Sequence, residues 1–404
     1  MGAAVRPDKV AVVAYSAPPY GAGGVASAHF NLFRLLQRAG LHARLFTFGE
    51  DGLEDDPEVI RRGTPRWFVS LLQRILTLLF AAVQPGKGAY QTADILKSYI
   101  GAKRMNREIS EFSPDVIILS DHGAPGLRLH KDKGSKVVLV SHHNPARFLA
   151  VPTANYSKLD VRLALFLERK VLKKVDAVVC PSSYMREWFE CTYEFNGVIR
   201  VIPNLLDEEL LETIHPLDLR SQFNMARGDA VVYLPSAGGP LKGADYLLDL
   251  IHRLCAKSER VIGFYVPGEI PPRLLERIGG LPDQARLCLT GQLPYEEHIG
   301  NVKACSFGIS PSAIENYSMA LLEAVHCGVP MLAFETGGNA DIIQNGENGY
   351  LVGEGDVGAL SEQALSLLDP GTLQVLKKKT LEFSRQTLSS QMALDAYLGL
   401  MSSL

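Results

Sequence analysis

The chain has 404 residues, 47% of them apolar and 21% charged, and this composition argues against global disorder, a collagen-like repeat or a long coiled coil. Its 41 Lys and Arg against 44 Asp and Glu give a net charge of −3, so no nucleic-acid partner is expected. The 6 cysteines form no C-x-x-C pair, and the opening apolar run is too short for a signal peptide. We therefore expect a cytoplasmic protein with reduced thiols.

Short apolar runs rich in β-branched residues alternate with amphipathic stretches in the first half of the chain. The first run, at 9–15, precedes a predicted helix at 24–39 that ends at Gly40, a typical C-cap residue. Further strands are predicted at 44–48, 115–120, 136–141 and 176–181. These runs are apolar throughout, as expected for parallel strands that helices cover on both faces.

A second series of the same kind starts near residue 230. Its predicted strands lie at 231–235, 261–266, 285–290, 306–310 and 330–334. Two successive series predict an α/β protein with two Rossmann-like doubly wound domains, which we expect to face each other across a cleft and to bind ligands at the carboxyl ends of their strands. We expect domains at 1–203 and 204–385; the last segment, 386–404, forms a helix that packs on either domain, and we place it on the first.

One segment, residues 66–83, interrupts this alternation. Its sequence, RWFVSLLQRILTLLFAAV, gathers the polar residues on one narrow helical stripe, and Arg61 and Arg62 make its start basic. It is shorter than the about 20 uninterrupted apolar residues that a membrane span requires. We expect a helix packed on the first sheet; the alternative is a peripheral contact of 61–83 with anionic lipid at the inner membrane face.

The stretch SPSAIENYSMALLEAVHCGVP, at 310–330, combines several features of a phosphate site. A loop carries Glu315, and Ser318 is placed to cap a following helix. Backbone N–H groups and the helix dipole there form an anion site suited to a pyrophosphate. These N–H groups belong to Asn316, Tyr317, Ser318 and Met319. Glu323 follows about 7–8 Å along the axis, a distance suited to ribose hydroxyls; the simpler interpretation is two surface glutamates on a capped helix.

This stretch resembles the signature of family 4 of the retaining, nucleotide-sugar-dependent glycosyltransferases, which adopt the two-domain GT-B architecture. In that signature a Pro-Ser precedes a Glu, an aromatic-containing turn follows, and Leu-Leu-Glu-Ala comes next. Further segments that resemble the family lie at 201–204, 328–330, 336–341 and 345–352. The resemblance implies that Glu315 contacts the transferred sugar, that Glu323 contacts the ribose, and that the main chain of 316–319 holds the diphosphate.

A Gly-rich loop, LPSAGGPLKGAD, follows the first strand of the second series. A cation at Lys242 would neutralise the charge that builds on a departing diphosphate, and the family has a Lys-Gly at this place. We expect further donor contacts from Ser236 and Gly238 in the same loop. The simpler interpretation of Lys242 is a solvated loop lysine.

The family usually carries an arginine five or six residues before this lysine, and this chain does not. Ala237 and Ser236 stand at those positions. We consider Arg147 and Arg273 as candidates to supply the missing cation. Without a replacement, the chain would be a catalytically weak nucleotide-sugar-binding protein.

The segment PPYGAGGVA, at 18–26, joins the first strand to the first helix. Family 4 members resemble it with a Gly-Gly-Val close to the donor phosphates, which here begins at Gly23 and Gly24. The string also fits a dinucleotide fingerprint, so an NAD(P)-dependent oxidoreductase is an alternative, as is a plain tight turn. Two observations argue against NAD(P) binding. The glycines do not follow the strand directly, and the acidic pair at 50–51 lies farther along the chain than the acid that contacts the ribose in a dinucleotide fingerprint.

The segment SHHNPARF follows a buried strand of the first domain. The family often has a histidine here near the reacting end of the sugar; His142 occupies that place, with His143 as the rival and His122 as a further candidate. A structural histidine bonded to a loop carbonyl is the simpler interpretation. The chain has no D-x-D triplet, and we expect no metal. Main-chain contacts to the base are expected near Gly291 and Leu293.

Together with the family resemblance, these features predict a metal-independent hexosyltransferase that moves a sugar from a UDP- or GDP-linked donor to an acceptor hydroxyl, in glycan, glycolipid or glycosylated-metabolite biosynthesis. The resemblance implies that this transferase retains the anomeric configuration. The predicted catalytic residues are Glu315, Lys242 and His142. The first domain would bind a sugar, lipid-linked or small-molecule acceptor, the second would bind the donor, and no separate cofactor is expected. The alternatives are the weak binding protein and the oxidoreductase; a nucleotide-sugar epimerase fits less well, because the two-glutamate region resembles transferases.

Overall fold

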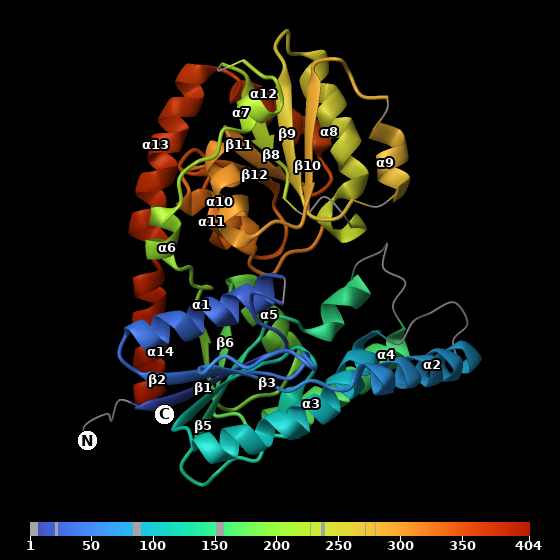
Figure 1. Cartoon of the computed structure of the whole chain (residues 1–404), viewed down its shortest axis with the longest axis vertical. Helices are drawn as coiled ribbons and strands as arrows, with labels where there is room; N and C mark the ends of the chain where they lie inside the picture. The colour runs from blue at the N-terminus through green and yellow to red at the C-terminus, as the bar shows by residue number, and fades with distance from the viewer. Residues whose placement is uncertain are drawn as a thin grey trace. The chain divides into compact units, whose positions relative to one another are not determined.

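The structure is a computed structural model that describes the chain except for residues 1–6, 21–22, 84–89, 151–156, 227, 236–238, 271 and 279, and except for the side chains at 77, 81, 83, 148, 150, 240 and 273. The chain divides into two compact units. The first unit comprises Met1–Leu206 and Gln391–Leu404, and the second comprises Asp207–Ser390. Each unit is a parallel sheet flanked by helices (Figure 1).

The first unit is built on a seven-stranded parallel sheet with the strand order β3-β2-β1-β4-β5-β6-β7. Strands and helices alternate, because each parallel strand needs a crossover connection. Its elements are β1 (Lys9–Ala14), α1 (Gly24–Arg38), β2 (His42–Thr47), β3 (Val59–Arg61), α2 (Arg66–Val83), α3 (Tyr90–Phe112), β4 (Val116–Ser120), η1 (Pro125–Leu127), β5 (Lys136–Val140), η2 (Pro145–Ala150), α4 (Lys158–Leu172), β6 (Ala177–Cys180), α5 (Ser183–Thr192), β7 (Val198–Val201) and α14 (Ser390–Ser403).

Helices cover both faces of this sheet, and a hydrophobic cluster fills each side. Helices α1 and α14 close one side, with Phe33 and Tyr397 in its core. Helices α3, α4 and α5 close the other side, where Met105 is fully buried. Within β1, Val12 faces the first cluster and Val13 the second. Because successive side chains point to opposite faces, burial on both faces makes the whole strand apolar.

The second unit contains a six-stranded parallel sheet with the order β10-β9-β8-β11-β12-β13. Its strands are covered in the same way, and residues such as Phe264 and Leu332 are fully buried. Its elements are α6 (Glu208–Thr213), α7 (Leu219–Gln222), β8 (Ala230–Tyr233), η3 (Pro240–Lys242), α8 (Ala244–Ala256), β9 (Ile262–Pro267), α9 (Pro272–Ile278), β10 (Ala285–Gly291), α10 (Tyr295–Ala304), β11 (Phe307–Ser310), α11 (Met319–His326), β12 (Met331–Phe334), η4 (Gly337–Asp341), β13 (Gly349–Val352), α12 (Val357–Ser366) and α13 (Pro370–Thr387).

The strands predicted from apolar runs are all present, within about two residues of their expected ends. The sequence pattern does not reveal three further strands, β3, β7 and β13. All three lie at sheet edges. An edge strand is only partly covered, so its side chains need not be apolar throughout; in β7 all four residues are half-buried or exposed.

Helix α2 has the predicted bounds but not the predicted packing. Its main partner is α3 rather than the sheet, and its apolar side chains include Trp67 and Leu78, which are 70% and 73% exposed. The expectation that its wide apolar face belongs to the core is therefore wrong for a large part of that face. No helix in the described ranges has the length and apolar character needed to cross a membrane.

Candidate functional site

The winding of the second sheet reverses between β8 and β11. These strands are hydrogen-bonded neighbours, although β9 and β10 come between them in the chain. At such a switch point the connections leave toward opposite faces of the sheet, and the crevice between them is where open α/β sheets bind ligands. The segment after β8 carries Lys242, and the loop after β11 carries Glu315. The fold thus brings residues from two separate motifs to one crevice.

Lys242 and Glu315 form an ion pair. The Nζ of Lys242 donates to Oε1 of Glu315 across 2.7 Å, and the two side chains are 41% and 8% exposed. A carboxylate as buried as Glu315 requires a charged or hydrogen-bonding partner. The lysine supplies this partner and remains accessible, so it can turn toward an anionic ligand. Neither a free solvated lysine nor a surface glutamate describes this pair.

Two glycines allow the neighbouring loops to close on Glu315. Gly337, after β12, has φ 56°, and a Cβ there would lie 1.7 Å from the carbonyl oxygen of Glu315. Gly243, directly after Lys242, has φ 83°, and a Cβ there would lie 2.2 Å from the carbonyl oxygen of Pro311. Side chains do not fit at either position, and the positive φ is unfavourable for them. Glycine is therefore what permits three loops to meet at this point.

Helix α11 begins at the predicted place, but not with the predicted cap. Ser318 occupies the N-cap position, and its side chain makes no capping hydrogen bond. The expectation of a serine-capped helix is wrong in this respect. The first-turn N–H groups, which include that of Met319, have no side-chain acceptor at the N-cap, so they and the helix dipole are oriented to favour an anion. Tyr317 is buried beside them, and Asn316 is half-buried.

Glu323 lies on the buried side of α11 and faces α10. Its carboxyl group is hydrogen-bonded to the side chain of Tyr295, the first residue of α10. Burial raises the pKa of Glu323 to about 7, and the hydrogen bond from Tyr295 offsets only part of this effect. Burial and the charge of Glu323 also raise the pKa of Tyr295, so the phenol remains the donor. This glutamate is likewise not a surface residue.

His142, the third predicted catalytic residue, belongs to the first unit and follows β5. Its Nε2 lies 2.9 Å from Oδ1 of Asn204; the amide oxygen can only accept, so Nε2 carries the proton. The His142 ring lies 5.2 Å from the ring of His29 on α1. Burial lowers the pKa of each of these histidines to about 4, so both are neutral at pH 7.

The rival histidines lie in the loops after β4 and β5. His143 Nε2 is 2.5 Å from Oε1 of Gln91, and its ring lies 5.1 Å from that of His122. Asp121 accepts the backbone N–H of His143 at 2.8 Å, and burial lowers the pKa of this histidine. Across the described parts of the chain, no three His, Cys, Asp or Glu side chains are grouped so as to hold a metal ion.

The glycines that we expect to contact the donor are exposed to solvent or have open space where a side chain would be. Gly23 is the N-cap of α1 with φ 116°, Gly24 is the first residue of that helix, and a Cβ on Gly23 would meet nothing within 4 Å. Gly291 ends β10 with φ 64° and equally open space, and Leu293 is half-buried before α10. The predicted donor contacts that fall outside the described residues are Ser236 and Gly238.

The replacement of the family's missing arginine stays a prediction. Arg147 is buried in the first unit, where its Nε donates to the carbonyl oxygen of His143 at 3.2 Å, so it supports the loop that carries the histidines. The side chain of Arg273 and the whole of Ala237 are outside the part of the chain that the structure describes.

Three residues beside the predicted ones were not assigned to the site from the sequence. Asn204 ends the Val-Ile-Pro-Asn segment, so its position in that segment was the available signal. His29 lies on the buried face of α1, where Nδ1 is 2.9 Å from the carbonyl oxygen of Val25. The helical spacing of His29 predicts that this residue is buried, but it does not predict that its ring lies beside the ring of His142. Tyr295 had no sequence signal, because only the tertiary structure brings α10 to α11.

Two family models match the chain. The model described as Glycosyltransferase Family 4 matches residues 22–210, and the model described as Glycosyl transferases group 1 matches residues 229–370. Among curated proteins, the 2-deoxystreptamine N-acetyl-D-glucosaminyltransferase of Streptomyces fradiae is 28% identical over 232 residues, which is 53% of this chain and 52% of that protein. The chain spans about half the length of the curated relatives it matches.

Solved structures of similar fold cover nearly all of the chain. A sucrose-phosphate synthase from Thermosynechococcus elongatus aligns with a TM-score of 0.73 and 19% identity over 98% of this chain and 100% of that one. Anabaena HepE in complex with UDP-glucose aligns with a TM-score of 0.70 and 16% identity over 98% and 100%. The two matched segments together cover most of the chain, and the fold agrees throughout. The chain therefore belongs to the GT-B glycosyltransferases and carries a Glycosyltransferase Family 4 domain followed by a group 1 domain.

Proposed function

We propose that this chain is a glycosyltransferase that moves a sugar from a UDP- or GDP-linked donor to an acceptor hydroxyl. The observation that supports the proposal most directly is the Lys242–Glu315 pair at the switch point between β8 and β11, beside the N-terminus of α11. An accessible cation and uncapped amides there favour a diphosphate. The glutamates on either side offer acceptors for sugar and ribose hydroxyls.

On binding, the donor diphosphate would replace Glu315 as the partner of Lys242. The released carboxylate of Glu315 would then accept hydrogen bonds from the transferred sugar, while the amides of 316–319 hold the phosphates. Glu323, at the buried end of the site, would accept from the ribose. Lys242 and the amides stabilise the charge that develops on the leaving diphosphate, which is the part of the reaction that most needs electrostatic help.

We propose retention of configuration by attack on the same face of the sugar. The bond between the anomeric carbon and the acceptor oxygen forms as the bond to the diphosphate oxygen breaks, and the acceptor proton passes to that leaving oxygen. No cofactor or metal has a role in this scheme, because Lys242 and the helix N-terminus supply the positive charge. The neutral His142 would act as a hydrogen-bonding group near the reacting sugar, and we place this reaction in the cytoplasm.

The names of the similar proteins narrow the first donors to try. HepE was crystallised with UDP-glucose, and the Streptomyces relative is named for the transfer of N-acetylglucosamine. We therefore rank UDP-linked glucose and N-acetylglucosamine ahead of GDP-linked sugars. The acceptor class remains a sugar, a lipid-linked glycan or a small molecule, in glycan, glycolipid or glycosylated-metabolite synthesis.

The test begins with thermal unfolding in the presence of UDP, GDP or NAD, followed by transfer from a panel of sugar donors to candidate acceptors. Lys242→Ala and Glu315→Ala should each lower transfer by about a hundredfold without unfolding the protein. The matched control is Lys379→Ala, because Lys379 forms a comparable pair with Glu347 at 3.1 Å, half-exposed and away from the crevice. Wild-type transfer rates in both site variants would refute the assignment. NMR of the product anomer tests retention, and chelator treatment tests metal independence.

The absent arginine supports a second candidate, a protein that binds a nucleotide sugar with little turnover. Residues 236 and 237 are serine and alanine, so the leaving group has one cation fewer than the family usually provides. Calorimetric binding of the donor with no release of nucleotide across the acceptor panel would favour this candidate. Stabilisation by NAD but not by UDP would favour the oxidoreductase instead.

A further inference from the structure

Helix α2 carries an apolar face that nothing in the described part of the chain covers. The exposed members of this face are Trp67, Leu71, Ile75, Leu78 and Leu79, with exposed fractions of 70%, 49%, 45%, 73% and 59%. Positions 67, 71, 75 and 78 recur every three or four residues and therefore lie along one side of the helix. Leu76 and Phe80 are buried instead, and α3 is the main partner of α2. The helix thus has one apolar face that packs and a second that does not.

The charges beside this face have one sign. Helix α2 contains no acidic residue, and its two charged residues are Arg66 and Arg74. Both are exposed, and neither forms an ion pair within the described part of the chain. An unpartnered apolar stripe bordered by arginines is typical of a helix that lies in the plane of a lipid interface.

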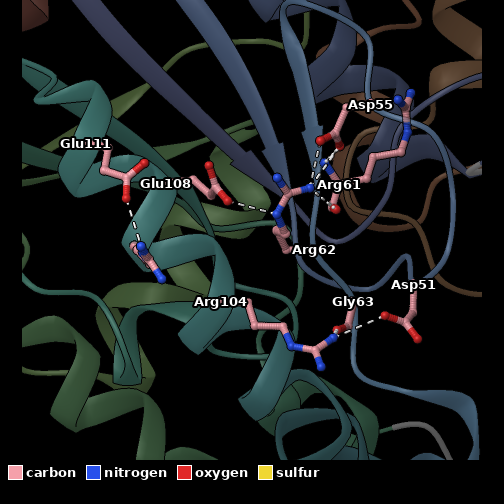
Figure 2. Close-up of polar contacts among 9 residues, drawn as sticks. Asp51, Asp55, Arg61, Arg62, Gly63, Arg104, Glu108 and Glu111 are labelled. Carbon is pink, nitrogen blue, oxygen red and sulfur yellow. Dashed lines mark hydrogen bonds and ion pairs between the residues drawn. The ribbon is translucent and has the colours of Figure 1, made fainter.

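The two preceding arginines are not part of this surface. Arg62 donates to Asp55 at 2.8 Å and to Glu108 of α3 at 2.9 Å (Figure 2). Arg61 is buried, with its Nε 3.5 Å from Glu50. The positive charges of Arg61 and Arg62, which the sequence places just before α2, are therefore balanced by acidic side chains of the same unit. The Arg62–Glu108 pair ties the segment before α2 to α3, so the start of α2 is held against the first unit.

Helix α4 also packs on α3 and adds to the positive field. Its exposed basic residues are Lys158, Arg162, Arg169 and Lys170. Its two acids turn inward: Asp160 accepts the backbone N–H groups of Gln91 and Thr92, each at 2.8 Å, and Glu168 accepts from Tyr193. No acidic side chain of α4 therefore faces solvent.

We propose that α2 docks the first unit onto the surface of an anionic lipid bilayer, with the exposed apolar side chains in the interface and Arg66 and Arg74 at the lipid phosphates. Charge complementarity selects this occupant. In a symmetric contact between two copies the same patch meets itself, so a surface whose only charges are positive would meet another positive surface with no acid to balance it. Trp67 suits the headgroup region, where its ring is apolar and its N–H is wet. The inference does not depend on the donor site, which lies in the second unit.

Co-sedimentation of the full chain with vesicles tests the proposal. We expect binding to phosphatidylcholine vesicles that contain about one-third phosphatidylglycerol, weak binding to pure phosphatidylcholine, and loss of binding in high salt. Equal binding to both vesicle types at low and high salt, or binding to neither, would overturn it.

Matched variants assign the binding to α2. Arg66→Glu with Arg74→Glu should lower partitioning by at least about tenfold, and Leu71→Asp with Leu78→Asp should do the same. The controls are Lys378→Glu and Val375→Asp on α13, where the side chains are 80% and 61% exposed. Circular dichroism checks that each variant is folded. An effect of the α13 variants equal to that of the α2 variants would contradict the assignment.

A fluorescence measurement keeps the proposal testable even if an aspartate variant unfolds. The chain has 2 tryptophans, Trp67 and Trp188, and Trp188 packs beside Tyr184 of α5. Anionic vesicles should shift the emission to the blue, and lipids brominated on the acyl chain should quench it. Trp67→Phe should abolish both signals while binding persists. Persistence of the shift in Trp67→Phe, or a concentration-dependent dimer that the α2 variants abolish, would contradict docking on lipid.

Discussion

At the scale of single residues, burial decides how the two glutamates of the candidate site are held. Glu315 and Glu323 have the same small exposed fraction of 8%, but their partners differ. Glu315 has the ammonium of Lys242, and Glu323 has the phenol of Tyr295. An ammonium balances the charge of a carboxylate, whereas a phenol supplies one hydrogen bond and no charge. The pKa of Glu323 is accordingly raised to about 7.

This raised pKa makes stability depend on pH. Between its ordinary value of 4.5 and about 7, the folded chain keeps a proton on Glu323 that the unfolded chain releases. The contribution to stability is therefore complete below about pH 4.5 and is lost as the pH rises through 7. Glu323→Gln should remove this dependence, so that the variant gains up to about 3 kcal/mol on the wild type between pH 5 and pH 8. Urea unfolding at both pH values measures the difference, with the exposed Glu297→Gln on α10 as the control. Parallel profiles for wild type and Glu323→Gln would contradict the burial of this carboxyl.

At the scale of elements, the site depends on how closely three loops pack. The loops after β8, β11 and β12 come from neighbouring positions in the sheet order, and glycines at 243 and 337 remove the Cβ atoms that would separate them. Strand and helix positions alone would place the loops at the same edge of the sheet. The absence of two side chains is what brings their backbones into contact.

A comparison of two glycines with similar backbone conformations distinguishes the effect of close packing from the effect of backbone strain. Gly337 has φ 56° and a carbonyl oxygen 1.7 Å from its ideal Cβ, whereas Gly346 has φ 78° and nothing within 4 Å. Gly346→Ala should cost about 1–2 kcal/mol from strain alone and leave nucleotide binding unchanged. Gly337→Ala carries the same strain and also displaces Glu315, so it should weaken UDP binding by about tenfold or more. Calorimetric titration of folded variants measures both, and equal affinities would show that the contact at Gly337 does not position the site.

At the scale of the whole molecule, the chain forms two units with separate cores, and the last helix belongs to the first unit. Helix α14 follows the second unit in sequence, yet its side chains complete the cluster on one face of the first sheet. Tyr397 and Leu400, for example, are 3% and 5% exposed. The core of the first unit is therefore complete only after the second unit and α14 have both been made.

Removing one α14 side chain should destabilise one unit only. Tyr397→Ala leaves a cavity against α1 and the first sheet and should cost the first unit about 3–5 kcal/mol. Met392→Ala, on the same helix and 60% exposed, is the control and should change little. Calorimetry with and without UDP separates the two units, since the nucleotide should stabilise the second. The Tyr397 variant should lower only the transition that UDP does not raise; a shift of both transitions together would show that the units unfold as one.

The amino-acid sequence alone predicts the two sheets and the strands at their centres, and it is the source of the hypothesis for the main residues of the candidate site. Central strands such as β1 and β12 are buried on both faces, so their apolar runs are visible without neighbours. The spacing between Glu315 and Glu323 and the loop around Lys242 are local features of the chain, and they predicted an anion site. Residues acting within one turn or one motif can be read in this way, because their geometry depends on nearby backbone.

Features that depend on residues far apart in the sequence could be found only in the tertiary structure. The edge strands β3, β7 and β13 have only three or four residues each, and each forms where a neighbouring strand offers hydrogen bonds. Tyr295 reaches Glu323, and Asn204 reaches His142, only after the helices and strands have packed. Packing against α3 likewise determines which apolar face of α2 is buried. An amphipathic pattern predicts that an apolar face will be covered, but it does not identify the element that covers it.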